Sequence, residues 1–147
     1  MAGKKIPTSV LLQRLFKTSS ISRFINNYSE KAGGVAEFNE YINNLCAQKD
    51  ISPKEVIKKS DIERNYGHQL FKGIRKPSRD KVIQLAFGFE LSYEETQKLL
   101  AVARKSALYA KIERDAVIIY ALKHKYNIQD VQLTLYELSI PLLGDER

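Results

Sequence analysis

Residues 51–86 read ISPKEVIKKSDIERNYGHQLFKGIRKPSRDKVIQLA, and they carry the helix signals that decide the fold. Ser52 and Glu55 have the spacing of a capping box, in which each side chain satisfies the other's free backbone amide. Pro53 stands at the first helical position, where its missing N–H costs nothing. The start of this stretch therefore predicts a short helix over 53–60.

The next signals follow within a few residues. Ser60 and Asp61 are typical of a turn. A second short helix is predicted over 63–72, because Gly73 is a strong stop signal. Ser78 is placed to cap a further helix. The stretch thus predicts two short helices joined by a tight turn, then a basic loop and another helix.

Apolar residues recur three and four positions apart over most of the remaining chain, which predicts helices. These helices are expected over 36–48, 79–88, 92–104, 112–124 and 128–138, with two shorter ones between residues 10 and 28. No run alternates with period two, so the predicted fold class is all-α. Three segments are expected: 1–34, a basic arm with short helices; 35–105, a central domain; and 106–147, a C-terminal helical hairpin packed on it.

A weak internal repeat links two of these helical hairpins. Shifting residues 79–100 by 35 positions aligns them with 114–135, and seven identities result, among them Arg-Asp at the start of each segment. The helix-start signals also correspond, Ser92 with Asn127. Two explanations remain open at this point: an internal duplication, or the general likeness of any two amphipathic hairpins.

The composition contains no pattern typical of an enzyme or a metal centre. Cys46 is the single cysteine, so an internal disulfide is impossible, and it falls among apolar helix positions where a buried side chain is expected. The two histidines, His68 and His124, make no ligand pattern with it. Neither a glycine-rich phosphate loop nor a catalytic triad can be assembled. We therefore expect no catalytic residue, no bound metal and no cofactor.

The longest apolar run is AVIIYAL at 116–122, far shorter than the roughly 20 residues that cross a bilayer. Gln13 and Arg14 interrupt the first apolar stretch, which excludes a secretory signal. A cytoplasmic protein without membrane contact is expected. The absence of acidic residues from 1–29 also suits an organellar transit peptide, the less favoured reading.

Positive charge is concentrated in two places. The net charge is +7 and the isoelectric point is about 9.4. Residues 1–32 hold six basic residues and one acidic residue, and residues 49–79 hold nine basic and four acidic ones. Such clusters favour an anionic partner, of which nucleic acid is the first candidate.

The quoted stretch resembles the lambda-repressor/Cro-type (XRE) helix-turn-helix family. The likeness lies in the two short helices and in FKGIRKPS at 71–78, which matches the family's glycine, basic pair and Pro-Ser. It covers about 36–105, and LYAKIERDAVIIYALKHKYN at 108–127 resembles a C-terminal extension found in bacterial proteins of this type. The resemblance implies a lambda-repressor-like bundle, here extended by the arm and the hairpin, and a bacterial transcription regulator that binds double-stranded DNA.

The resemblance also implies which residues meet DNA. Helix 63–72 would enter the major groove, where arginine pairs with guanine and asparagine or glutamine with adenine. Base-reading positions fall on Arg64, Asn65 and Gln69, positions facing DNA or its backbone on His68 and Lys72, and the phosphate-binding loop on Arg75, Lys76 and Ser78.

Five positions depart from the family pattern. Pro53, Ile57, Asp61 and Gly67 replace respectively a usual glutamine, small residue, turn glycine and apolar residue. The fifth, Glu63, puts a negative charge beside the phosphates that the resemblance implies. Glycine within a helix costs about 0.8–1.0 kcal/mol relative to alanine. Because Ile57 and Gly67 would lie where the two helices touch, we hypothesise that Gly67 makes room for Ile57.

A second reading comes from another functional class. The same helical scaffold could serve as a signalling adaptor that binds protein and is controlled by phosphorylation of Thr18, Ser19, Ser20 or Ser22 in the arm. In that reading the arm contacts the protein partner, whereas in the first it adds contacts to the DNA backbone. Residues 20–30 are expected to dock on the body. Residues 112–143 are expected either to pack on the core or to form a homodimer contact, the former being favoured.

Overall fold

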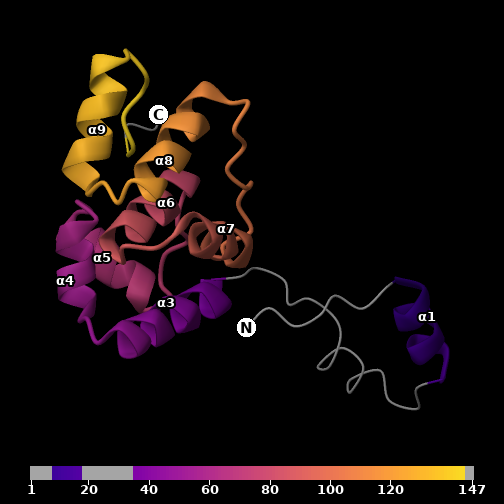
Figure 1. Ribbon diagram of the computed structural model, residues 1–147. Coiled ribbons are helices and arrows are strands. Elements are labelled where there is room, and N and C mark those ends of the chain that lie inside the picture. Colours follow the sequence, from indigo (N-terminus) through magenta and orange to yellow (C-terminus); the bar gives the residue numbers. More distant parts are fainter. Residues whose placement is uncertain (1–7, 18–34, 145–147) are drawn as a thin grey trace. The chain divides into compact units, whose positions relative to one another are not determined.

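The computed structural model of the protein describes residues 8–17 and 35–144 (Figure 1). Contacts within the chain separate two compact units, residues 1–33 and 34–147. The first contains α1 (Thr8–Lys17), a helix whose Leu12 and Phe16 side chains are exposed. The helix expected near 21–28, the docking of 20–30 and the phosphorylation candidates lie outside the described residues.

The second unit is built from helices joined by short turns. They are α3 (Val35–Lys49), α4 (Pro53–Lys59), α5 (Arg64–Phe71), α6 (Arg79–Gly88), α7 (Tyr93–Val102), α8 (Glu113–Lys123) and α9 (Ile128–Glu137). Each lies within two residues of a predicted helix at both ends. No strand occurs in the described ranges, so the prediction of an all-α fold is confirmed.

The middle of the unit is α6. All side chains from Val82 to Phe89 are buried, and α6 packs against α4, α7 and α9. A helix that is buried on every side belongs to the interior of a fold and not to its surface. In the C-terminal segment Ile118, Val131 and Leu135 are fully buried.

The start of α4 differs in one detail from the expected capping box. The Ser52 hydroxyl accepts the Glu55 amide at 3.2 Å, and Pro53 opens the helix as expected. The Glu55 carboxylate, however, accepts from the Ser52 hydroxyl at 3.4 Å and does not return to the Ser52 amide. Half of the predicted capping box is therefore formed.

Between α4 and α5 the chain turns through Asp61, whose φ of 55° lies in the left-handed region that aspartate tolerates better than most residues. Two glycines let α4 sit close to its neighbours. A Cβ on Gly67 of α5 would lie 2.7 Å from Ile57, and a Cβ on Gly88 of α6 would lie 1.9 Å from the Ser60 hydroxyl. The hypothesis that Gly67 makes room for Ile57 is confirmed in its geometry.

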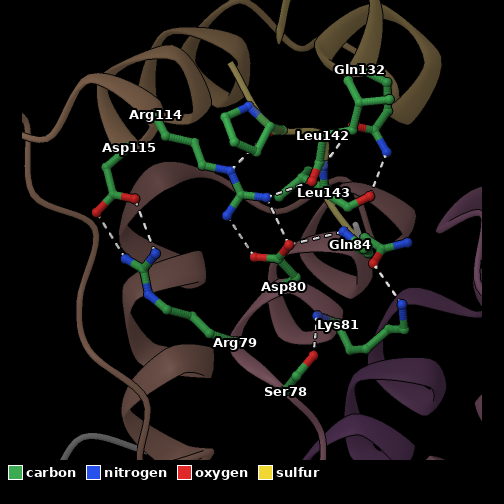
Figure 2. A network of polar contacts seen from close by, with 12 residues as sticks. Ser78, Arg79, Asp80, Lys81, Gln84, Arg114, Asp115, Gln132, Leu142 and Leu143 are labelled. Atoms are coloured by element: carbon green, nitrogen blue, oxygen red, sulfur yellow. Dashed lines mark hydrogen bonds and ion pairs between the residues drawn. The ribbon is translucent and has the colours of Figure 1, made fainter. Parts of the chain in front are cut away.

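Residues 79–109 and 114–144 form two equivalent hairpins, which we call the first and the second hairpin. They exchange a pair of ion pairs at the starts of α6 and α8 (Figure 2). Arg79 of the first binds both carboxylate oxygens of Asp115 at 3.0 and 2.8 Å, and Arg114 of the second binds both oxygens of Asp80 at 2.8 and 2.7 Å. Reciprocal contacts of this kind are the mark of a twofold relation, because a translational repeat gives contacts in one direction.

The remaining partners of these four side chains also repeat. Asp115 accepts the backbone amide of Tyr109, and Asp80 accepts that of Gly144. Each arginine additionally donates to two carbonyls of the loop that ends its own hairpin. These carbonyls belong to Ser106 and Ala107 in the first hairpin and to Pro141 and Leu142 in the second.

One glutamine closes the loop of each hairpin. Gln97 accepts the amide of Leu108 and donates to its carbonyl, and Gln132 does the same with Leu143. The helix starts match too, because Ser92 and Asn127 both take part in complete capping boxes. A chance likeness of two amphipathic helices would not reproduce these polar partners at one spacing. The repeat in the sequence is therefore a repeat in the structure.

Candidate nucleic-acid interface

One side of α5 is held in the core and the other faces outward. Gly67, Leu70 and Phe71 are buried, whereas Arg64 and Asn65 are exposed. This division follows from the helical period, since positions three and four apart share a face. The helix is therefore positioned by its inner side and leaves its outer side free for contacts.

Neighbouring elements fix α5 at both ends. Asn39 and Asn43 of α3 donate to the carbonyl of Phe71, at 3.3 and 2.8 Å, and so satisfy the end of the helix. At the other end, Gln84 of α6 donates to the carbonyls of Ser60 and Asp61 in the preceding turn. The turn and the helix are thus tied to α3 and α6, a role for these amides that sequence reasoning missed.

The residues proposed to meet DNA lie along this outer side and the loop that follows. The exposed ones are Arg64, Asn65, Lys72, Arg75 and Lys76, and the half-buried ones are His68, Gln69 and Ser78. Ser78 caps α6, because its hydroxyl accepts the amide of Lys81 at 3.2 Å. That hydroxyl therefore already accepts a hydrogen bond from its own chain.

Arg75 is held in place by two contacts. Its Nε donates to the Gln69 Oε1 at 2.8 Å, and its guanidinium lies over the Tyr66 ring, 4.6 Å from the centroid. A cation over an aromatic face is attracted by the negative charge of the ring's π electrons. The hydrogen bond from Arg75 uses one lone pair of the Gln69 side-chain oxygen. The Gln69 amide nitrogen is therefore more available than this oxygen for a further contact.

Tyr66 was not among the residues expected at this site. The Arg75 guanidinium lies 4.6 Å from the centroid of its ring, and the Lys81 ammonium lies 5.5 Å from the same centroid. These cations come from the loop and from α6, and they converge on one ring. Tyr66 is half-buried, so part of its ring stays accessible beside these cations.

Glu63 has a structural role of its own. Its carboxylate caps α5 by accepting the amides of Asn65 at 2.6 Å and Tyr66 at 3.1 Å. A carboxylate is favourable at this end of a helix, where the free amides give a partial positive charge. Because these amides are satisfied within the chain, contacts with a phosphate near Glu63 would have to come from side chains.

The described ranges, 8–17 and 35–144, bear on the expectations about a metal site, Cys46 and a membrane-spanning helix. No group of histidine, cysteine and acidic side chains in these ranges is placed to hold a metal ion. Cys46 is buried, as expected, and burial raises the pKa of its thiol. None of the helices described there is both long and apolar enough to cross a membrane.

No protein-family model, no curated protein and no solved structure matches the chain.

Proposed function

We propose that this protein is a DNA-binding transcription regulator of the XRE helix-turn-helix type, with α5 as the helix that enters the major groove. The observation that carries the proposal is the outer side of α5. It combines exposed Arg64 and Asn65 with an inner side that is packed in the core, so the base-reading groups stand on a rigid support. The loop that follows adds exposed Arg75 and Lys76.

The residues divide into two roles. Arg64, Asn65 and Gln69 would read bases, since their side chains can donate to guanine or pair with adenine. Arg75 and Lys76 would hold phosphates, which give affinity but carry no sequence information. Arg75 is preorganised for this role, because its contacts with Gln69 and Tyr66 fix its guanidinium before DNA arrives.

Selection from a pool of random duplexes, followed by binding assays on the enriched site, tests the proposal. Arg64→Ala is expected to cost about 1–3 kcal/mol and to relax the preference at one base pair. Lys76→Ala should weaken binding to every sequence alike and lower the slope of log affinity against log salt by about 0.9. Lys123→Ala, an exposed lysine at the end of α8, is the matched control and should change neither quantity. If the folded protein enriches no sequence at moderate salt, the proposal of a DNA-binding regulator is refuted.

The alternative is a signalling adaptor that uses the same scaffold to bind protein. Two observations favour it: Glu63 occupies the amides at the start of α5, and large apolar side chains stand exposed on the second hairpin. These are Tyr120, Leu133, Tyr136 and Leu138. The adaptor predicts weak, sequence-independent DNA binding that salt abolishes, with Arg64→Ala no worse than any surface arginine.

The arm and the oligomeric state are separate parts of the proposal. Deleting residues 2–8 should lower DNA affinity and flatten its salt dependence if the arm contacts the backbone, and an unchanged slope would exclude that contact. A homodimer would match two half-sites on DNA. Light scattering at tens of micromolar protein decides this point, since a monomer mass there excludes a stable dimer.

A further inference from the structure

A groove of about 500 Å³ lies between the two hairpins, where α6 and α8 end and where α7 and α9 begin. Arg79 and Arg114 exchange partners at the opposite ends of α6 and α8, so the groove is separate from that exchange. It is also separate from α5, which contributes no lining residue. Its volume is in the range of sites that take small molecules.

Equivalent residues of the two hairpins form the floor of this groove. Phe87 of the first hairpin corresponds to Leu122 of the second, and Leu91 corresponds to Tyr126. Three of these side chains are buried and Tyr126 is half-buried. Apolar side chains of both hairpins therefore line the floor of the groove.

The rim differs from the floor because the two hairpins diverge there. Glu90 of the first hairpin corresponds to Lys125 of the second, and both residues have φ near 58°. Glu90 pairs with Lys59 of α4 at 3.6 Å, so these two charges offset each other. Lys125 forms no ion pair with any residue in the described ranges. One ammonium group on the rim is thus left uncompensated beside an apolar floor.

We infer that this groove binds a small organic anion with a flat apolar body. The body would lie on Leu91, Leu122 and Tyr126, where burial of apolar surface contributes the affinity. The anionic group would meet Lys125, an exposed ammonium on the rim that has no ion-pair partner in the described ranges. An organic cation would face the same ammonium and is disfavoured. This inference does not rest on the proposed DNA binding.

Isothermal titration of the full chain with naphthalene-2-sulfonate tests the inference, and naphthalene-2-methanol is the uncharged probe of the same shape. The sulfonate should bind saturably with one site per chain, at least tenfold more tightly than the alcohol. Binding should also raise the unfolding temperature with probe concentration, because the ligand favours the folded state. Absence of saturable binding, or equal affinity for the two probes, would overturn the inference.

Two variants assign the site. Lys125→Glu should weaken the sulfonate at least tenfold, and it should fold, because Glu90 occupies the equivalent turn with the same φ. Lys123→Glu makes the same change of charge two residues away, outside the groove. Its affinity for the sulfonate should stay within twofold of that of the native chain. Gln129→Trp, at an exposed lining position, should block both probes by filling the groove. Equal losses in Lys125→Glu and Lys123→Glu would show a general charge effect and refute the site.

Discussion

The first and second hairpins share a framework of polar contacts and differ on the side where the first touches α4. Both keep the arginine and aspartate that they exchange, the glutamine that closes the loop and the capping box of the second helix. On the side of α6 that faces α4, the first hairpin has Gln84, Leu85 and Gly88. The second hairpin has Ile119, Tyr120 and Lys123 at these positions.

These differences have a physical cause. Gly88 brings the α4 backbone close enough that a Cβ there would lie 2.7 Å from the carbonyl oxygen of Val56. Lysine at the equivalent position would prevent any helix from approaching α8 in the same way. Leu85 is fully buried, whereas Tyr120 is 53% exposed. The shared residues therefore hold the two hairpins together, and the divergent ones decide which hairpin supports α4 and, through it, α5.

The largest effect is expected from the ion pairs that the hairpins share. Arg114→Met leaves the buried carboxylate of Asp80 without its partner and should lower the free energy of unfolding by about 3–5 kcal/mol. Arg79→Met should cost a similar amount, because Asp115 is equally buried. Urea denaturation measures both. Lys59→Met, which breaks an exposed pair, is the control and should cost under about 1 kcal/mol.

The next contrast is between two equivalent side chains. Leu85→Ala should destabilise the protein by about 2–5 kcal/mol, because it leaves a cavity between α6 and its neighbours. Tyr120→Ala should change stability by roughly 0.5 kcal/mol or less, as is usual for exposed positions. Equal losses in the two variants would mean that something covers the second hairpin in solution.

A smaller effect is expected from placing alanine at the equivalent positions 88 and 123 of the two hairpins. Gly88→Ala places a Cβ against Ser60 and the α4 backbone, and overpacking of this kind costs about 1–3 kcal/mol. Lys123→Ala at the equivalent position should be neutral, since alanine has a high helix propensity. Thermal unfolding of both variants compares them directly. A neutral Gly88→Ala would contradict the close packing of α4 on α6.

The other glycine beside α4 can be tested by a double-mutant cycle. Gly67→Ile should destabilise by about 1–3 kcal/mol, because Ile57 already fills the space that a side chain would need. Adding Ile57→Ala should recover much of that loss, which gives a coupling energy of roughly 0.5–3 kcal/mol. Simple additivity of the two changes would show that the residues do not share this space.

The smallest effect concerns acid. Burial acts to raise the pKa of Asp80, but hydrogen bonds from Arg114 and the Gly144 amide, with the charges of Arg114 and Lys81, outweigh it and lower the pKa. A lowered pKa means that the carboxylate stabilises the fold above its unfolded pKa of about 3.9, and that this stability is lost as pH falls through the folded value. Asp80→Asn should therefore show a shallower loss of stability below about pH 4 than the native chain. If the free energy of unfolding fell with pH equally in the two proteins, this role for Asp80 would be contradicted.

The sequence predicted the helices well because their signals are local. Capping residues and apolar spacing lie within one turn of the helix they define, as Ser92 and Glu95 show for α7. The repeat was also visible, and its Arg-Asp identities point to the residues that prove to be paired. What could not be read was which arginine binds which aspartate. Contacts 34 and 36 residues apart depend on the arrangement of whole hairpins.

The candidate site was predicted in its members but not in its internal contacts. The positions from Arg64 to Lys72 come from the family resemblance, and in the structure Arg64 and Lys72 are exposed. The contact of Arg75 with Tyr66 and Gln69 depends on how a loop folds back on α5, which no local pattern encodes. Glu63 was read as an unfavourable charge, whereas its spacing to Tyr66 is that of an N-cap.

The exchange between the hairpins also bears on how the chain is made. During synthesis, Asp80 and Arg79 leave the ribosome long before their partners, and Asp80 receives the amide of Gly144, 64 positions later. In a nascent chain that stops before residue 114, Arg79 and Asp80 lack their partners Asp115 and Arg114. Folding of the first hairpin would then bury these charges without counterions, which disfavours it until the second hairpin is complete. The central helix that supports α5 can thus be finished only when nearly the whole described chain has emerged.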